Sequence, residues 1–305
     1  MVSRRDLLQG SAASLVTGTV AVAMGGAAAA TESKPAEASG PSPEFVTGTP
    51  RLFFTEEGEG ERQIVFLHGW ACDSHDWSWQ LPAFAARHRC LAVDLRGHGR
   101  SEVTAAGYAP EDFVADVIAL IEARAAGQPV TLVGHSMGGQ IAVRLAAARP
   151  DLASALVLAD ATIGLPESFE KPYRDFCDAM DKGIPGEVAP PLFRALYTAE
   201  SSPALIEWHR RRLQGMAPHV LRQSIRPLFL GPGQVAMGRA SEEICRKVAC
   251  PVYAIHRSES RAGTVRPWFK NEKSIVVPWV GSGHWVQLDR PEVFNDGVLN
   301  WLETL

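Results

Sequence analysis

The stretch that decides the fold is residues 129–149, which read PVTLVGHSMGGQIAVRLAAAR. Its first five residues form an apolar run typical of a short buried strand, and residues 139–149, rich in alanine and leucine, predict a helix. Between them, Gly134, Ser136 and Gly138 fit the Gly-x-Ser-x-Gly pattern of a sharp strand-to-helix turn. The glycines avoid collisions with the neighbouring strand and helix, so we expect the Ser136 hydroxyl at the exposed apex of the turn.

Two interpretations of Ser136 are open, a nucleophile or a small residue that merely fits a tight turn. The pentapeptide alone arises by chance, so its place between a strand and a helix is what gives it weight. That place favours the nucleophile, because the amides of the helix N-terminus would face a negative oxygen formed beside Ser136.

The composition bounds the class of protein. The chain has 305 residues, of which 46% are hydrophobic and 21% charged, enough for one globular domain with an insertion. The formal net charge is -4 and no long basic stretch occurs, so we expect no nucleic-acid partner.

The first thirty residues have the three parts of an export signal. Paired arginines at 4–5 are followed by an apolar stretch rich in Ala, Val and Gly, and the small residues at 28–30 allow cleavage. The paired arginines resemble the twin-arginine type of signal, which carries folded proteins across a membrane. We therefore predict a signal peptide at residues 1–30 and a periplasmic or secreted protein.

The alternative interpretation of this segment is an uncleaved membrane anchor. Threonine, serine and glycine interrupt the apolar stretch throughout, which makes it a weak membrane span and favours cleavage. After cleavage we expect no stable membrane association. Residues 31–44, with Pro, Ser, Glu and Ala, predict a disordered spacer, and the mature domain is expected to begin near Phe45.

Strand-like and helix-like segments alternate along much of the remaining chain. This alternation predicts an α/β fold, with a mainly parallel twisted sheet covered by helices on both faces. The predicted strands are 63–67, 89–93, 130–133, 155–158, 252–255 and 274–277. Further helices are predicted over 110–125 and 292–302.

The alternation stops between Asp160 and Pro251, where no clear strand occurs. Helical pieces separated by Pro and Gly occupy this part of the chain, at 169–182, 187–197, 203–215 and 218–229. A helical insertion after the strand that follows the turn is most simply a cap over the site. We therefore assign residues 45–160 and 241–305 to an α/β core and residues 161–240 to the cap.

The cysteines give no sign of a metal site. There are five, an odd number that leaves at least one unpaired: Cys72, Cys90, Cys177, Cys245 and Cys250. A bridge between Cys245 and Cys250, or one from cap to core, is compatible with export. Buried thiols are the interpretation we favour, because proteins with twin-arginine signals fold in the reducing cytoplasm.

Four short motifs follow one another along the chain. A predicted strand ends in His68-Gly69, residues 94–101 read DLRGHGRS, the serine turn follows at 134–138, and GSGH stands at 281–284 after the insertion. Motifs of this kind in this order resemble the α/β-hydrolase family over residues 45–305. The resemblance implies that family's fold.

The resemblance also implies the base and the oxyanion donors. His284, in the loop after the last predicted strand, matches the family's catalytic histidine and would take the proton of Ser136. The backbone N–H groups of Met137 and Trp70 match the donors of the oxyanion hole. The alternatives are a surface loop histidine and an indole ring that packs on its own loop, the latter compatible with the same amide role.

The carboxylate that should orient His284 is missing from its usual place. Family members usually carry it after the penultimate strand in a run such as H-G-D-x-D, where this sequence reads HRSES at 256–260. Asp160, at the end of the strand after the nucleophile strand, is one candidate, at a site that some relatives use. Glu259, one position before the usual slot, is the other. We favour Asp160 and keep a site without a strong acid as a third alternative.

Aromatic residues gather around the expected entrance to the site. We predict that Trp77, Trp285 and His135 line the substrate pocket, and that Phe169 and Tyr173 begin the cap above it. As a group, such residues favour a small substrate with a hydrophobic acyl or alcohol moiety.

These residues together predict a serine hydrolase that cleaves a carboxylic ester or lactone through an acyl-enzyme. Nothing in the sequence calls for a metal or an organic cofactor, and a serine at 136 argues against dehalogenases and epoxide hydrolases, which need a carboxylate nucleophile. A C–C bond hydrolase and a non-catalytic ligand-binding protein stay open. So does a cofactor-free dioxygenase, which would use the same acid and is compatible with His68-Gly69-Trp70.

Overall fold

The computed structural model describes residues 44–46, 50–199 and 201–305. The predicted signal peptide, and all but the last residue of the predicted spacer, lie outside the described residues. Within the described part of the chain, no helix has both the length and the apolar character needed to cross a membrane.

An eight-stranded sheet forms the centre of the described part of the chain. Its order is β1-β2-β4-β3-β5-β6-β7-β8, in which β1–β2 and β2–β4 are antiparallel and every other pair is parallel. The strands are β1 (Glu44–Val46), β2 (Leu52–Glu57), β3 (Gln63–Leu67), β4 (Arg89–Val93), β5 (Val130–His135), β6 (Ala153–Ala159), β7 (Val252–His256) and β8 (Ile275–Pro278). The predicted mainly parallel sheet is confirmed, with β1 and β2 added before the first predicted strand.

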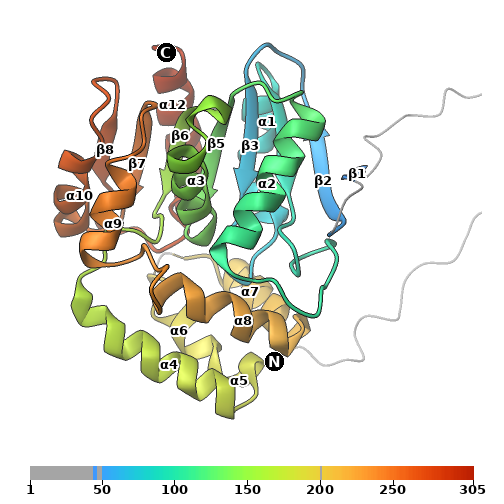
Figure 1. The fold of residues 1–305 in the computed structure, drawn as a ribbon, viewed down its shortest axis with the longest axis vertical. Coiled ribbons are helices and arrows are strands. Elements are labelled where there is room, and N and C mark those ends of the chain that lie inside the picture. Colours follow the sequence, from blue (N-terminus) through green and yellow to red (C-terminus); the bar gives the residue numbers. More distant parts are fainter. Residues whose placement is uncertain (1–43, 47–49, 200) are drawn as a thin grey trace, which may run out of the picture. The chain divides into compact units, whose positions relative to one another are not determined.

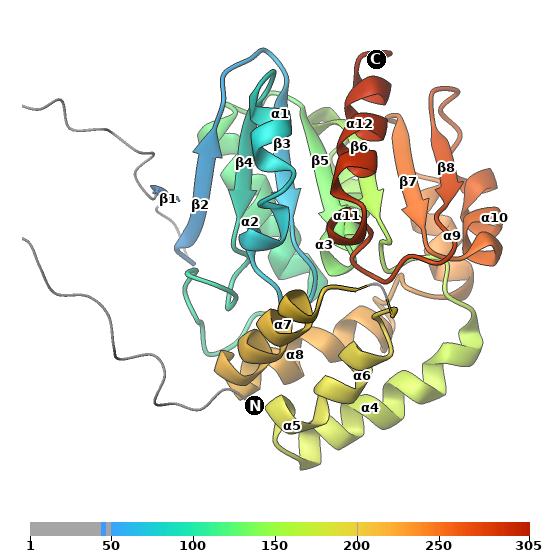
Figure 2. The same cartoon turned by 180° about the vertical axis from the view of Figure 1, so that it is seen from behind.

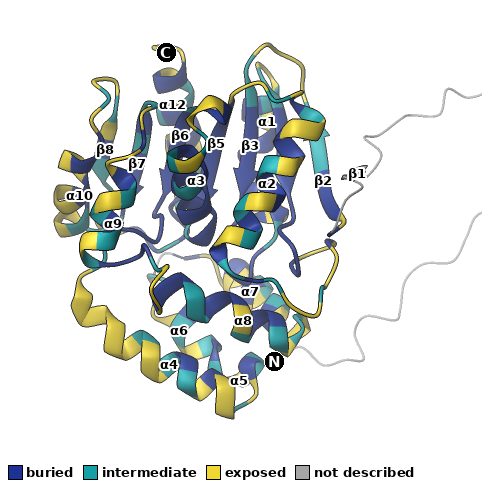
Figure 3. Cartoon of the chain, in the orientation of Figure 1, coloured by how far each residue is buried: buried dark blue, intermediate teal, exposed yellow. Residues whose placement is uncertain are grey.

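Helices cover both faces of the sheet. They are α2 (Pro110–Arg124) and α3 (Met137–Ala148) on one face, and α1 (Leu81–Ala85) and α12 (Pro291–Leu302) on the other, as Figures 1 and 2 show from opposite sides. The side chains of β3 point alternately to the two faces of the sheet. Val65 and Leu67 pack with α2 and α3, whereas Ile64 and Phe66 pack with α1 and α12. A strand buried on both faces is apolar along its length, and Figure 3 shows the central strands as buried.

The predicted helical cap follows β6 and lies at the end of the sheet where the parallel strands finish (Figure 1). Its helices are α4 (Glu170–Lys182), α5 (Pro185–Val188), α6 (Pro190–Arg194), α7 (Pro203–Gly215) and α8 (Pro218–Phe229). Proline is the first residue of each of the last four, where its missing N–H costs no hydrogen bond. The predicted helical piece at 187–197 is therefore divided, because Pro190 begins a new helix.

Candidate active site

Ser136 occupies the predicted turn between β5 and α3. Its backbone has φ 51° and ψ -113°, in the left-handed half of the map that residues other than glycine rarely adopt. A Cβ at Gly138 would lie 2.2 Å from the backbone oxygen of Leu67, and one at Gly134 would lie 2.5 Å from that of Gly138. Only glycine allows these close approaches, and they let the chain turn so sharply that Ser136 faces the cavity described below.

The imidazole of His284 is hydrogen-bonded to Asp160, with 2.6 Å between Nδ1 and Oδ2. Asp160 directly follows β6, has a positive φ of 42° and is fully buried. His284 lies in the loop between β8 and α11 (Val286–Asp289). Glu259, the alternative acid, is exposed at the first residue of α10 (Glu259–Val265), and it is absent from the residues that line the cavity.

The loop of His284 is held by both core and cap. The backbone N–H of His284 donates to the oxygen of Leu196, in the cap, at 2.8 Å. Its backbone oxygen lies 3.0 Å from Nε2 of His135, at the end of β5. These contacts fix the main chain from which the imidazole projects, so the cap contributes to the placement of a residue of the core.

Two arginines face the carboxylate of Asp160. The backbone N–H of Arg257 donates to Oδ1 at 3.3 Å, its Nε lies 3.4 Å from Oδ2, and Arg261 forms an ion pair with Oδ1. Nε of Arg261 also donates to Nδ1 of His256 at 3.0 Å, and burial lowers the pKa of His256 to about 4. His256 is therefore neutral and serves as an acceptor that holds Arg261 in place.

The pKa of His284 lies well below its ordinary value. Burial is the largest cause, and the positive charges of Arg257 and Arg261 add to it. The imidazole is consequently neutral at pH 7, and a neutral imidazole is the form that can accept a proton.

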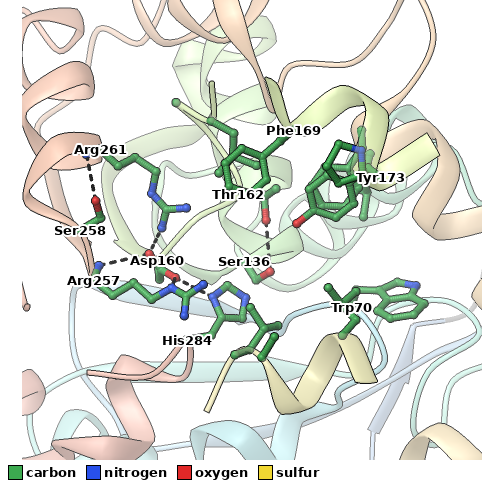
Figure 4. Close-up of a pocket in the computed structure, with 18 of the residues that line it drawn as sticks. Trp70, Ser136, Asp160, Thr162, Phe169, Tyr173, Arg257, Ser258, Arg261 and His284 are labelled. Atoms are coloured by element: carbon green, nitrogen blue, oxygen red, sulfur yellow. Dashed lines mark hydrogen bonds and ion pairs between the residues drawn. The ribbon is translucent and has the colours of Figure 1, made fainter. Parts of the chain in front are cut away.

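The hydroxyl of Ser136 is hydrogen-bonded to that of Thr162, with 3.1 Å between the two oxygens. In the described residues no hydrogen bond joins Ser136 to His284, although the view of Figure 4 places the His284 ring between Asp160 and Ser136. Thr162 was not among the predicted site residues. It follows Asp160 closely, and only the return of the chain from β6 past the turn brings it to Ser136.

Two backbone amides are free beside Ser136. Met137 is the first residue of α3, and Trp70 follows β3 in a tight turn in which Ala71 has φ 57°. No acceptor among the described residues takes the N–H of either. The Trp70 indole donates to Ser224 of α8 at 2.9 Å, which ties this turn to the cap. An amide without an acceptor can donate to a negative oxygen placed next to it.

A cavity of about 510 Å³ lies over these groups, with Ser136, Asp160 and His284 in its wall. Most of the remaining wall is apolar and comes from the cap. The aromatic part includes Trp70, Phe169, Tyr173, Phe176, Phe193, Phe229 and Trp285. Tyr173 and Phe229 stack face to face, with ring centroids 3.5 Å apart. A cavity of this size and lining accommodates a small organic molecule.

The family model described as the alpha/beta hydrolase family matches residues 64–296. The chain belongs to this family. It is 26% identical over 257 residues to an (E)-2-((N-methylformamido)methylene)succinate hydrolase of Acinetobacter baylyi, covering 82% of this chain and 94% of that protein. It is also 27% identical over 273 residues to the dihydrolipoyllysine-residue acetyltransferase component of an acetoin cleaving system from Pseudomonas putida. That match covers 87% of this chain and 70% of that protein.

Solved structures share the fold of this α/β-hydrolase. A bromoperoxidase from Bacillus anthracis superposes with a TM-score of 0.73 at 21% identity, covering 86% of this chain and 100% of that one. An enol-lactonase from Burkholderia xenovorans gives 0.72 at 18% identity, covering 85% and 100%. Hydrolases, a lactonase and peroxidases are thus among the similar proteins.

The three predicted pocket residues of this α/β-hydrolase have different places. Trp285 and His135 line the cavity. Trp77 does not, and its prediction as a pocket residue is wrong. It is fully buried on the sheet face covered by α1 and α12, with its ring 5.2 Å from that of Phe66 and 6.3 Å from that of Phe294. An aromatic residue after a strand can turn to either face, and the spacing of Trp77 does not tell which.

Cys72, Asp76 and His209 form a buried group whose potential ligand atoms lie within 4.8 Å of one another. The spacing of the cysteines could not reveal it, because His209 comes from the cap. Arg212 already donates to Asp76 at 2.5 Å, so a cation balances this carboxylate. All five cysteines are free, and four are buried, in agreement with the buried-thiol interpretation.

Proposed function

We propose that this α/β-hydrolase is a serine hydrolase that cleaves a carboxylic ester or a lactone through an acyl-enzyme. The observation that carries the proposal is the 2.6 Å hydrogen bond between His284 and Asp160, in a cavity whose wall also holds Ser136. A carboxylate bound to Nδ1 orients the imidazole and stabilises its charged form, so that Nε2 can act as a base. Hydrolases among the sequence relatives support hydrolysis as the reaction type.

In the proposed reaction, Oγ of Ser136 attacks the carbonyl carbon while Nε2 of His284 accepts the hydroxyl proton. The N–H groups of Met137 and Trp70 donate to the oxyanion of the tetrahedral intermediate. When the bond to the leaving oxygen breaks, His284 returns the proton to it, and the acyl group stays on Ser136. Water then gives a proton to His284 while its oxygen attacks the acyl carbon. When the bond from that carbon to Oγ of Ser136 breaks, His284 passes this proton to Oγ, which restores the serine hydroxyl and the neutral imidazole and releases the acid.

Before the attack, the hydroxyl of Ser136 exchanges its hydrogen bond to Thr162 for one to His284. Rotation about the Cα–Cβ bond moves Oγ while the strained backbone stays in place. Catalytic hydrogen bonds of ligand-free enzymes are often long and tighten only with substrate bound. Thr162 therefore holds the resting hydroxyl, and it does not act as the base.

The sharpest test is covalent labelling with a fluorophosphonate, which reacts with an activated serine. The wild type should be labelled at Ser136, and Ser136→Ala should abolish labelling and lower turnover by about 10⁴- to 10⁶-fold. Ser78→Ala, the same change at an exposed serine, is the matched control and should keep both. A wild type that resists the probe would remove the basis for an acyl-enzyme.

A substrate panel separates the proposal from its competitors. Esters of p-nitrophenol with acyl chains of graded length, together with several lactones, should yield substrates that the wild type turns over. A dioxygenase would instead consume oxygen with a heteroaromatic substrate, and a C–C hydrolase would act on ring-fission products but not on the esters. Neither result is expected.

We also propose that residues 1–30 export the enzyme by the twin-arginine route, so that it meets its substrate in the periplasm or outside the cell. The paired arginines at positions 4 and 5 support this proposal. Replacing both by lysine should retain full-length protein in the cytoplasmic fraction, as measured by fractionation and immunoblotting. Unchanged export of the double variant would contradict it.

A further inference from the structure

The cavity of this enzyme has two unlike ends. In Figure 4, Arg257 and Arg261 lie on one side of Ser136, and Trp70 and Tyr173 lie on the other. The arginines come from the segment after β7, whereas Tyr173 belongs to α4 of the cap. A substrate that reaches across Ser136 therefore meets a cationic wall on one side and an aromatic wall on the other.

The charged groups of the cavity wall do not balance. Two guanidinium groups, those of Arg257 and Arg261, face a single carboxylate, that of Asp160, among the described residues that line it. Because His284 is neutral, the wall carries an excess of one positive charge. Two cations that share one carboxylate against a largely apolar cavity are incompletely neutralised, so an anion from outside the chain would be bound favourably there.

The hydrogen-bonding capacity of Asp160 is already used. One oxygen pairs with Arg261 and accepts the backbone N–H of Arg257, and the other accepts from His284 and lies 3.4 Å from Nε of Arg257. A carboxylate offers about four acceptor positions, and these partners occupy most of them. Asp160 can therefore neutralise one guanidinium fully, but not two.

Arg257 is the guanidinium left over. Nε of Arg261 donates to His256, and the Arg261 side chain is only 12% exposed. The Arg257 side chain is 33% exposed, and its nearest carboxylate contact is 3.4 Å from Nε. No described residue accepts a hydrogen bond from its two terminal nitrogens. These nitrogens present a planar pair of donors, the shape that binds a carboxylate through two parallel hydrogen bonds.

We propose that Arg257 binds a carboxylate of the substrate, so that the enzyme acts on an ester or lactone with an anionic group on one side of the scissile carbonyl and an apolar group on the other. This inference rests on the proposed hydrolase function and narrows its substrate class. The aromatic wall receives the apolar part, where the Trp70 ring lies 5.9 Å from that of Phe193 and 6.3 Å from that of Phe176. The carboxylate thus selects the substrate and also sets its direction in the cavity.

The test compares esters that differ only by a carboxylate. On the acyl side the pair is p-nitrophenyl valerate and p-nitrophenyl hemiglutarate, and on the alcohol side it is phenyl butyrate and 3-carboxyphenyl butyrate. Rates without enzyme are subtracted. In at least one pair, the wild type should have a higher kcat/KM for the anionic ester. Arg257→Gln should reduce that preference by about 10- to 100-fold, the worth of one charge-assisted hydrogen bond.

The matched control is Arg174→Gln, which removes the same charge from α4 at an exposed position paired with Glu170. Arg174→Gln should leave the preference for the anionic ester unchanged. If the preference came from long-range attraction by the protein's positive charges, it would fall in both variants. Equal preference of the wild type and Arg257→Gln in both ester pairs would overturn the inference. Fluorophosphonate labelling of Ser136 needs no carboxylate on the probe. Labelling without any anionic preference would therefore contradict the substrate class alone, and absence of labelling would contradict the hydrolase itself.

Discussion

The segments that follow β6 and β7 lie next to each other and carry opposite charges. The two strands pair in parallel, with Ala159 opposite Ile255, so the residues after each strand reach the same edge of the sheet. The segment after β6 supplies Asp160, and the segment after β7 supplies Arg257 and Arg261. Members of the α/β-hydrolase family usually carry the acid after the second of these strands, whereas this sequence favours Asp160, after the first. The comparison teaches that the carboxylate on His284 comes from the segment after β6, while the segment after β7 supplies the cations that face it.

Of the two segments, the one after β6 should have the larger effect on turnover when its charged residue is changed. Asp160→Asn keeps the shape of the side chain but removes the negative charge that orients and stabilises the His284 imidazole. We expect turnover of an ester substrate to fall by about 10²- to 10⁴-fold, with binding of substrate less affected. Steady-state kinetics of the wild type and Asp160→Asn with the best ester of the panel measures this loss of turnover. Turnover close to that of the wild type would show that Asp160 is not the acid.

The next effect is on stability and comes from the β7 side. Arg261→Gln removes a guanidinium that is almost fully enclosed and leaves the buried Asp160 with weaker compensation. We expect a loss of about 3 kcal/mol in the free energy of unfolding, at the low end for a broken buried ion pair because Arg257 still faces the carboxylate. Denaturant unfolding of this variant beside Arg174→Gln, an exposed control, would measure the difference. Equal stability of the two variants would mean that the buried pair contributes nothing.

A smaller effect concerns pH. Activity requires neutral His284, so it is present above the pKa of this residue and is lost as the pH falls through it. Burial, and then Arg257 and Arg261, hold that pKa well below its ordinary value, so the acid limb of the wild-type kcat/KM should lie well below pH 6.5. Arg257→Gln should move this limb to higher pH, measured with a neutral ester so that carboxylate binding plays no part. A limb that stays in place or moves to lower pH would contradict the charge arrangement.

The smallest effect is expected at Glu259, the acid on the β7 side. Its side chain is exposed at the start of α10 and does not line the cavity. Glu259→Gln should therefore change turnover by no more than about twofold, as surface substitutions usually do. If this variant lost as much activity as Asp160→Asn, the roles of the two segments would have to be exchanged.

Several site residues could be located from the sequence because each lies where a local pattern ends. The turn at Ser136 needs glycines on both sides, and the glycine-rich loop of His284 follows a strand directly. Asp160 was the favoured acid because the usual position holds serine. All three residues follow strands that run in parallel, whose carboxyl ends meet at one edge of the sheet, and the α/β-hydrolase resemblance implies the roles of His284 and of a carboxylate beside it.

Other features could not be predicted, for reasons that lie in the packing. The aromatic residue Trp77 belongs to the core, because only the path of the chain after β3 decides which face of the sheet it meets. Arg257 and Arg261 stand in the segment that lacks the usual aspartates, and the order of residues alone does not show which group they face. A pair of arginines four residues apart after a strand is a signal that could have been used, since such a spacing can bring both side chains to one carboxylate. No pattern in the sequence predicts the hydrogen bond between Ser136 and Thr162.

By itself, the sequence determined the class of fold, the strained turn with its serine and the histidine loop, because short-range sterics and hydrophobic patterning act along the chain. Only the tertiary structure decided which carboxylate meets His284, that two arginines share it, and that one guanidinium is left facing the cavity. Those outcomes depend on distances between strand ends and on the balance of buried charge, and both arise only when segments far apart in the chain are packed together.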